Sequence, residues 1–276
     1  MNLVVQGAAA TPADASHLAS LTGAQSVEPL GATAWRLLDA THSDAVAGYC
    51  EARSLDHAWV PAERRLADLR LIAMDMDSTL ITIECIDEIG GMFGIKPQIA
   101  AITESAMRGE IDFPESLRRR VSLLAGLAVE GLDRVYEETL RLSPGAENLI
   151  HRAQALGIKT LLVSGGFTYF TEHLQKRLGL DHTLSNVLEI EAGKLTGRVT
   201  GAIVDAQAKA TRLVELTQTL GLSQHQTLAI GDGANDLAMM AVAGVSVAYR
   251  AKPVVRAKAT HALNHSGLDA ALNLFG

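Results

Sequence analysis

Four short apolar segments in the second part of the chain each end in a polar or acidic loop. They occupy residues 71–74, 160–163, 227–230 and 245–248. Uninterrupted apolar runs of this length are typical of strands buried on both faces of a parallel sheet. Helix-compatible stretches such as 146–156 and 167–178 separate the later runs. The alternation predicts an α/β fold with a doubly wound parallel sheet.

Three of these apolar segments are followed by residues that can do chemistry. The three loops begin with Asp75, Ser164-Gly165-Gly166 and Gly231-Asp232-Gly233. Ligands of doubly wound sheets bind outside the carboxyl ends of the strands, where such loops cluster. The pattern therefore predicts one site at this edge of the sheet.

The segment from about residue 83 to 143 interrupts the alternation between the first and second core strands. Its helix-compatible stretches are 86–92, 97–107, 114–124 and 133–140. We interpret it as an inserted helical cap that can close over the site and exclude water. Residues 187–190 and 195–199, around Ala192-Gly193, predict a β-hairpin projecting from the core.

Residues 1–66 have a pattern of their own. Strands are expected at 3–5, 26–29, 34–38 and 57–60, with helices from about 12 to 21 and 44 to 53. The order βαββαβ predicts a small α+β domain of ferredoxin-like type. Pro61 and the charged stretch 62–70 form a plausible linker, so we expect domains at 1–66 and 67–276.

Composition and charge narrow the class of protein. The net charge of -7 disfavours nucleic acid as a main partner, because phosphate-backbone binding needs a basic face. Only two cysteines occur, which favours a reduced setting without disulfides. No run approaches the ~18 apolar residues that cross a bilayer, and the start lacks a basic, apolar leader. We expect a cytoplasmic protein that uses neither membrane nor nucleic acid.

Asp75 and Asp77 lie two residues apart where the first core strand ends. Period-2 alternation places both side chains on the same side of the backbone. One carboxylate can attack phosphorus while the other protonates the leaving oxygen and later takes a proton from water. A solvated acidic turn is the more common explanation of an isolated Asp-X-Asp, so the second acidic loop decides between the two interpretations.

That second loop is Gly231-Asp232-Gly233-Ala234-Asn235-Asp236. A carboxylate nucleophile repels a phosphate dianion, so the reaction needs a divalent cation. Mg²⁺ prefers carboxylates, carbonyls and water. Asp75, Asp232 and the backbone carbonyl of Asp77 supply such a set, and Asp236 either joins it or supports it from behind.

Two further features could bind the phosphate. Ser164-Gly165-Gly166 offers a hydroxyl and bare backbone N–H groups before an expected helix, which is a typical anion cradle. Lys209 could balance the charge of phosphate and nucleophile. Each is weak by itself, because Ser-Gly-Gly is also ordinary turn sequence and a lone lysine is usually a surface residue.

The ordered motifs resemble those of the haloacid dehalogenase (HAD) superfamily. They are Asp75-X-Asp77-X-Thr79, Ser164-Gly165-Gly166, Lys209 and Gly231-Asp232-Gly233-Ala234-Asn235-Asp236. The resemblance runs from about residue 71 to the end of the chain and is strongest to the phosphatases that act on phosphoserine. It implies Asp75 as nucleophile and metal ligand, Asp77 as general acid and base, and Asp232 as the remaining Mg²⁺ ligand.

The same resemblance implies the residues that hold the substrate. Ser164, Gly165 and Lys209 match phosphate contacts, and Asn235 matches a substrate-binding residue. Two cap residues match the groups that recognise an amino acid: Glu84 for the ammonium and Arg120 for the carboxylate. Met107 and Phe113 match apolar residues that line the pocket. The implied activity is hydrolysis of phosphoserine, the last step of serine biosynthesis.

Alternatives remain at this point. One is a related HAD phosphatase or phosphotransferase that acts on another small phosphomonoester, against which Glu84 and Arg120 argue. Another is a phospho-aspartate sensing module without turnover, against which Asp77 argues, because a stable phospho-aspartate needs no neighbouring acid. The region 1–66 resembles ACT-type regulatory modules, which implies a role in homodimer formation and possible binding of serine.

Overall fold

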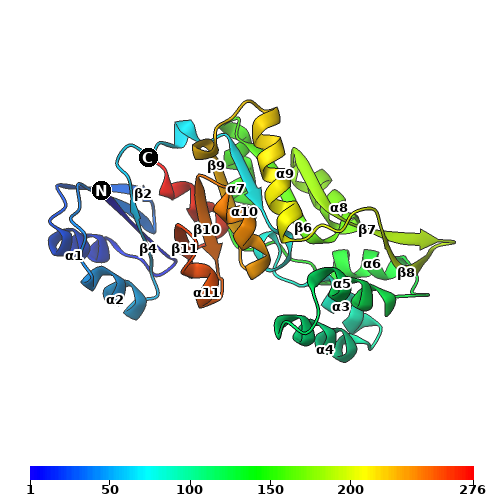
Figure 1. Ribbon diagram of the computed structural model, residues 1–276. Helices are drawn as coiled ribbons and strands as arrows, with labels where there is room; N and C mark the ends of the chain where they lie inside the picture. Colours follow the sequence, from blue (N-terminus) through cyan, green and yellow to red (C-terminus); the bar gives the residue numbers. More distant parts are fainter.

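The computed structural model describes all residues from Met1 to Gly276. The N-terminal part forms a four-stranded antiparallel sheet at one end of the molecule, in the order β2-β3-β1-β4 (Figure 1). Its elements are β1 (Asn2–Gln6), α1 (Pro12–Thr22), β2 (Ser26–Gly31), β3 (Ala34–Leu38), α2 (Ala45–Ala52) and β4 (Asp56–Val60). The predicted βαββαβ order is confirmed.

Local sequence explains how this unit begins its first helix. The side chains and backbone of Thr11 and Asp14 bond each other reciprocally, and Pro12 occupies the first helical position. Leu3 and Val5 on β1 then pack with Leu18 of α1 in a separate small core. The opposite face of β1 and β4 faces the rest of the protein, because Val4 and Val60 pack in its main core.

The rest of the chain forms a seven-stranded sheet in the order β11-β10-β9-β5-β6-β7-β8. Its strands are β5 (Leu71–Met74), β6 (Lys159–Phe167), β7 (His182–Glu191), β8 (Lys194–Thr200), β9 (Thr227–Gly231), β10 (Val245–Tyr249) and β11 (His261–Leu263). All neighbours are parallel except β7 and β8, which form a hairpin. The first strand in the chain, β5, therefore lies at the centre, between β9 and β6.

Helices cover both faces of this sheet. They are α7 (Ala146–Ala155), α8 (Thr168–Leu178), α9 (Ala206–Thr219), α10 (Leu237–Ala241) and α11 (Pro253–Arg256). Along β5, Ile72 and Met74 point into the core that includes α7 and α8, while Leu71 and Ala73 point toward α9 and α10. The uninterrupted apolar run is thus buried on both sides, and the predicted doubly wound fold is confirmed.

Two strands of this sheet were not predicted. Residues 182–186 of β7 pair in parallel with β6 before the hairpin begins, and β11 has only three residues. Neither segment has an apolar run long enough to reveal a buried strand, because β11 and the first part of β7 lie toward the edges of the sheet. The predicted hairpin between 187 and 199 is present.

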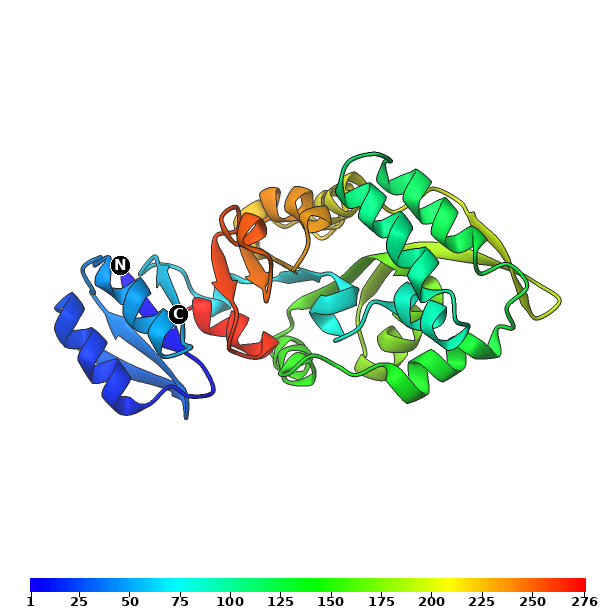
Figure 2. The same ribbon diagram turned by 90° about the horizontal axis from the view of Figure 1, so that it is seen from below.

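The cap lies between β5 and β6, as predicted. It contains α3 (Cys85–Met92), α4 (Lys96–Met107), α5 (Phe113–Ser122), α6 (Glu130–Arg134) and a π-helical turn η3 (Val135–Thr139). Its two connections to the core bond to each other, with the Thr82 N–H donating to the carbonyl of Arg141 at 2.9 Å. Figure 2 shows the cap as a separate helical layer beside the sheet edge.

A second attachment holds the cap to the tip of the β7–β8 hairpin. The N–H of Gly126 donates to the carbonyl of Leu195 at 2.8 Å, and the N–H of Leu195 donates to the carbonyl of Leu127 at 2.9 Å. Gly197 of β8 lies so close to the end of α5 that a Cβ atom there would approach the Ala125 Cβ to 2.8 Å. The cap is therefore fixed at two separated points.

The N-terminal sheet docks on the last segment of the chain, which includes the 3₁₀ helix η6 (Leu268–Leu274) (Figure 2). The buried carboxylate of Asp56 accepts hydrogen bonds from the N–H groups of Asn264, His265 and Ser266. Arg36 of β3 donates to the carbonyl of Asn273 at 2.9 Å. None of the helices in the protein combines the length and hydropathy required to span a bilayer.

Candidate active site

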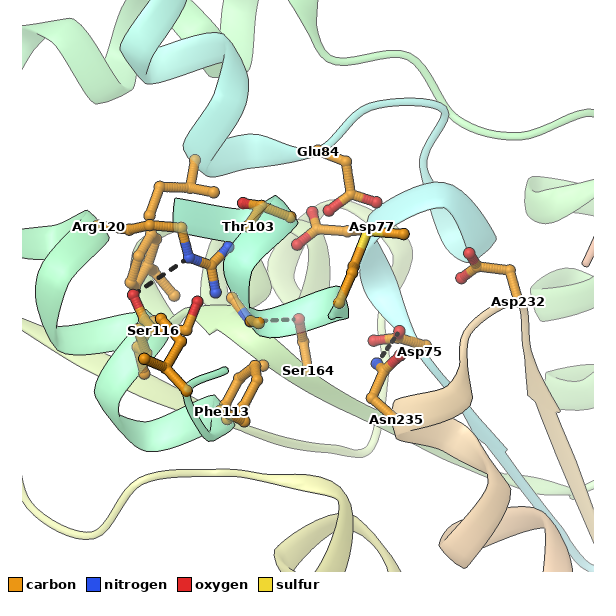
Figure 3. A pocket seen from close by; sticks show the side chains of 18 residues that line it. Asp75, Asp77, Glu84, Thr103, Phe113, Ser116, Arg120, Ser164, Asp232 and Asn235 are labelled. Atoms are coloured by element: carbon orange, nitrogen blue, oxygen red, sulfur yellow. Dashed lines mark hydrogen bonds between the residues drawn. The ribbon is translucent and has the colours of Figure 1, made fainter. Parts of the chain in front are cut away.

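A cavity of about 360 Å³ lies between the cap and the carboxyl ends of β5, β6 and β9. Eighteen residues line it, drawn from the strand-end loops and from α3, α4 and α5 (Figure 3). Ten predicted site residues are among them: Asp75, Asp77, Glu84, Met107, Phe113, Arg120, Ser164, Gly165, Asp232 and Asn235. The other two, Lys209 and Asp236, lie buried beneath the cavity.

Asp75 lies at the floor of the cavity, and its two carboxylate oxygens have different surroundings. Its Oδ1 accepts from the N–H of Met76 and from Lys209 Nζ, at 2.7 and 2.8 Å. Its Oδ2 has one weak partner, Asn235 Nδ2 at 3.4 Å (Figure 3). Burial raises the pKa of Asp75 and repulsion from Asp236 adds to it, while Lys209 opposes both.

Lys209 lies in the first turn of α9, which begins where the Asp205 side chain accepts from the N–H of Ala208. Its ammonium lies 2.8 Å from both Asp75 and Asp236, with only 1% of its side chain exposed. Burial disfavours the charged form, but attraction to the two carboxylates is stronger in sum and raises the lysine pKa. Lys209 thus contacts the carboxylates directly, and its predicted phosphate contact stays a prediction.

Three carboxylates meet beside this lysine. Asp75, Asp232 and Asp236 each place an oxygen within 4.8 Å of the others. Asp236 is already fully engaged, because it also accepts from the N–H groups of Asp232 and Gly233. Asp232 has a single side-chain partner, the Thr79 hydroxyl at 3.0 Å. Burial, followed by repulsion from Asp236, raises the Asp232 pKa to about 6.

The glycine before Asp232 is required by this packing. A Cβ atom on Gly231 would lie 2.4 Å from the carboxyl carbon of Asp236. Only a glycine lets the strand end pass this close to the buried carboxylate. Gly231 is therefore needed for the close approach of the backbone to Asp236, in agreement with the prediction for these glycines.

Asp77 points across the cavity toward Glu84 (Figure 3). Its Oδ1 accepts from the N–H of Cys85 at 3.3 Å. Burial first, and repulsion from Glu84 second, raise its pKa to about 7. A carboxyl group with this pKa carries its proton part of the time at neutral pH, as an acid catalyst requires.

The turn between the two strand-end residues and the cap is shaped by Ser78. This residue has a left-handed backbone conformation with φ 56°, which is uncommon outside glycine. Its hydroxyl donates to Glu84 Oε1 at 2.7 Å and so links the turn after β5 to the start of the cap.

The predicted order of strand, Ser-Gly-Gly segment and helix is confirmed, because α8 begins at Thr168, within one residue of the expected start. Strand β6 continues through Ser164-Gly165-Gly166 to Phe167. The segment is therefore not the loop that was expected. The backbone is extended instead, and the Ser164 hydroxyl accepts from the N–H of Gly166 at 2.8 Å.

Glu84 and Arg120 flank the cavity from the cap (Figure 3). The guanidinium of Arg120 extends toward the centre, and its Nε donates to the carbonyl of Ser116 at 3.4 Å. Arg120 forms no salt bridge within the protein, and burial lowers its pKa. Met107 lies at the rim with 68% of its surface exposed, and Phe113 packs against Gly165.

Several lining residues were not predicted to have a role in the site. They are Ile86, Thr103, Ala106, Ile111, Ser116, Leu117 and Phe167. The place of Ser116 in the site could have been predicted, because it lies one helical turn before Arg120 on the same face of α5. No sequence feature distinguishes the other residues from ordinary helix or strand residues.

Comparison with known proteins places these features in a family. Residues 72–241 match the family model of haloacid dehalogenase-like hydrolases, and residues 3–46 match a domain of unknown function (DUF4072). A phosphoserine phosphatase from Polaromonas is 54% identical over 215 residues, which are 76% of this chain and 91% of that protein.

Solved structures agree over a larger part of the chain. The crystal structure of a probable phosphoserine phosphatase from Vibrio cholerae, 41% identical, covers 99% of this chain and 85% of its own, with a TM-score of 0.88. A substrate-bound phosphoserine phosphatase complex, 36% identical, covers 75% of this chain and 99% of its own, with a TM-score of 0.71. The chain belongs to the haloacid dehalogenase-like hydrolase family.

Proposed function

We infer that this protein hydrolyses O-phospho-L-serine to L-serine and phosphate. The observation that carries this inference is a single cavity with two unlike ends. One end has the buried Asp75 and Lys209 pair, and the other has Glu84 and Arg120 from the cap. Relatives named phosphoserine phosphatases support the same substrate. The reaction is the last step of serine biosynthesis.

The surroundings of Asp75 support an assignment of the attacking atom. Since Oδ1 is held by Lys209 and the Met76 N–H, Oδ2 is the oxygen free to attack phosphorus. A bond forms between Oδ2 and phosphorus as the bond from phosphorus to the serine oxygen breaks. Asp77 gives its proton to the departing oxygen, then takes one from the water that hydrolyses the aspartyl phosphate.

A divalent cation fits the acidic cluster. The donors are all oxygens, which suits a hard ion such as Mg²⁺, and three carboxylates near one lysine, two of them buried, leave negative charge uncompensated. Asp75, Asp232 and the backbone carbonyl of Asp77 would hold it. Asp236 is occupied by Lys209 and two N–H groups, so we assign it a supporting role. The bound ion would neutralise charge between phosphate and carboxylates.

The remaining predicted residues divide between the two ends of the substrate. Ser164, Gly165 and Lys209 are proposed phosphate contacts, with Asn235 beside the attacking oxygen. Glu84 suits the ammonium group, and Arg120 suits the planar carboxylate because its guanidinium can bond bidentately. Met107 and Phe113 supply apolar wall.

The test is a panel of phosphomonoesters compared by kcat/KM in the presence of Mg²⁺. Phosphoserine should be preferred over analogues that lack either the ammonium or the carboxylate. Equal turnover of all phosphomonoesters would leave a phosphatase without the proposed selectivity. No phosphate release from any of them would instead favour a phospho-aspartate sensor.

We also propose that the protein acts in the cytoplasm and that its N-terminal unit, residues 1–66, mediates homodimer formation and possible binding of serine. The free cysteines Cys50 and Cys85 suit a reducing setting. Removing residues 1–66 and measuring mass in solution and inhibition by serine tests the role of this unit. A dimeric, equally serine-sensitive remainder would contradict it.

A further inference from the structure

Asn186 lies in β7, at the point where this strand leaves β6 and enters the hairpin. It is 1% exposed, and both ends of its side chain are hydrogen-bonded to backbone. The Nδ2 donates to the carbonyl of Gly165 at 2.8 Å, and the Oδ1 accepts from the N–H of Val204 at 2.8 Å. The two backbone groups belong to segments far apart in the sequence.

Each of these two segments leads directly to the active site. Gly165 lies in the last part of β6, which lines the cavity, where the pairing of β6 and β7 is irregular between Val163 and Phe167. The Asn186 amide therefore replaces a sheet hydrogen bond that this irregular stretch lacks. Without it, the Gly165 carbonyl would lose this hydrogen bond at a half-buried position beside the cavity.

Val204 precedes the residue that starts α9. Asp205 caps this helix, and its carbonyl accepts from the N–H of Lys209 at 3.0 Å. The position of Val204 thus sets where α9 begins, and the first turn of α9 carries the ammonium that holds Asp75 Oδ1. One side chain therefore connects the Ser164–Gly165 loop with the helix of Lys209.

The chemistry of asparagine matches this task. The site demands a donor toward Gly165 and an acceptor toward Val204 at the same time, and a primary amide supplies both. An aspartate of the same shape would turn an acceptor toward the Gly165 carbonyl, and a leucine would leave both backbone groups unpaired.

We propose that Asn186 is a positioning residue for phosphoryl transfer, which fixes the Ser164–Gly165 loop relative to Lys209. The inference rests on the proposed function. Asn186 does not line the cavity, so it acts only through its two backbone partners. Displacement of catalytic groups by about 1 Å can cost about 100-fold in rate. The two hydrogen bonds of Asn186 hold the backbone of Gly165 and of Val204 against such a shift.

The experiment compares Asn186→Asp and Asn186→Leu with Ser185→Ala. Ser185 is a matched control, because it is the buried neighbour on the same strand and bonds only the Thr171 hydroxyl, at 2.8 Å. For each variant, kcat and KM for phosphoserine are measured at saturating Mg²⁺, well below the melting temperature. Asn186→Asp keeps the shape of the side chain and can still accept from the N–H of Val204. It therefore provides a second test in case Asn186→Leu does not fold.

Both Asn186 variants should lose about 10- to 100-fold in kcat, with KM changed less than about threefold because Glu84 and Arg120 remain in place. Ser185→Ala should keep kcat within about twofold even where its melting temperature falls equally. Equal kcat losses in all three variants, or a change in KM alone, would reduce Asn186 to a structural residue. Failure of the proposed function would appear separately, as absence of phosphoserine hydrolysis by the unsubstituted protein.

Discussion

At the scale of single residues, the site is a set of carboxyl groups kept apart by their partners. Asp75 is held by a lysine, Asp232 by a hydroxyl, and Asp77 by one backbone N–H. Asp236 neutralises the lysine from below. These differences between the carboxyl groups, more than their number, support the proposed roles of one group as nucleophile and another as proton carrier.

Asp75→Asn should abolish hydrolysis of phosphoserine, with a loss of at least about 1,000-fold in kcat, because the amide is a poor nucleophile. Phosphate release measured under saturating Mg²⁺ checks this. The variant should stay folded, since its amide oxygen can still accept from Lys209. Retention of full activity would show that the mechanism at Asp75 is wrong.

Arg120→Ala should raise the KM for phosphoserine by about 10- to 100-fold, the equivalent of one charged hydrogen-bond pair. Phosphoethanolamine, which lacks the carboxylate, should change by less than about threefold in the same assay. Arg118 on the same helix is the matched control, because it does not line the cavity. Equal effects of Arg120→Ala on both substrates would remove the carboxylate contact from the proposal.

The raised pKa of Asp77 also predicts a pH effect on stability. With a pKa of about 7 in the folded state and 3.8 as the ordinary value, Asp77 binds a proton in the folded but not in the unfolded protein between these limits. Its contribution to the free energy of unfolding therefore falls as pH rises from about 4 to about 7 and is constant above that range. Half-buried histidines such as His57, whose pKa is lowered, change the stability in the opposite direction, so a difference measurement is needed.

Melting temperatures of the unsubstituted protein and of Asp77→Asn, measured without metal from pH 5 to 8, isolate this contribution. Asp77→Asn should gain several degrees relative to the unsubstituted protein as pH rises through that range. A constant difference between the two proteins would mean that Asp77 is already ionised at pH 5.

At the scale of elements, the apolar runs predicted the core strands because burial on both faces leaves no room for polar residues. The same logic failed at β11 and at the start of β7. Tertiary position, not local sequence, makes these segments strands. The site could likewise be predicted only in part. Asp75 and Asp232 follow apolar runs, so the sequence placed them at strand ends. The contact of Lys209 with two carboxylates depends on how α9 packs, which the sequence does not show.

Gly197→Ala should separate the cap from the hairpin. Its φ of 82° is unfavourable for alanine, and the new methyl group would meet Ala125 at 2.8 Å. We expect a loss of about 1–2 kcal/mol in stability and a raised KM, because α5 carries Arg120. Gly193→Ala is the control, since Gly193 has φ 75° in the same hairpin but open space around it.

Chemical denaturation and steady-state kinetics on both variants give the comparison. Gly193→Ala should share the stability loss that comes from backbone strain and keep KM unchanged. If the two variants have the same KM, the hairpin contact does not influence the position of the cap.

At the scale of the whole molecule, the N-terminal unit is joined to the phosphatase domain by buried polar contacts. Asp56 accepts from three successive N–H groups, and Arg36 reaches the carbonyls near the end of the chain. The sequence predicted the unit and its elements but not this docking. Both residues lie on strands whose short alternating pattern says nothing about the partner they meet.

Asp56→Ala should leave these N–H groups without partners and cost about 2–4 kcal/mol in the free energy of unfolding. Asp44, an acid with a fully exposed side chain in the same unit, should lose less than about 0.5 kcal/mol on the same change. Urea denaturation monitored by tryptophan fluorescence measures both. Equal stability of the two variants would indicate that the docking of the N-terminal unit contributes little.

The double attachment of the cap affects how products leave the site. A layer fixed at its connections and at the hairpin tip turns most readily about the line joining those two points. Arg120, on the helix beside the hairpin, then moves little, while the free edge near Met107 moves most. In the mechanism proposed above, serine leaves past that edge while the phosphorylated Asp75 stays covered, so release of the first product need not expose the intermediate to bulk solvent.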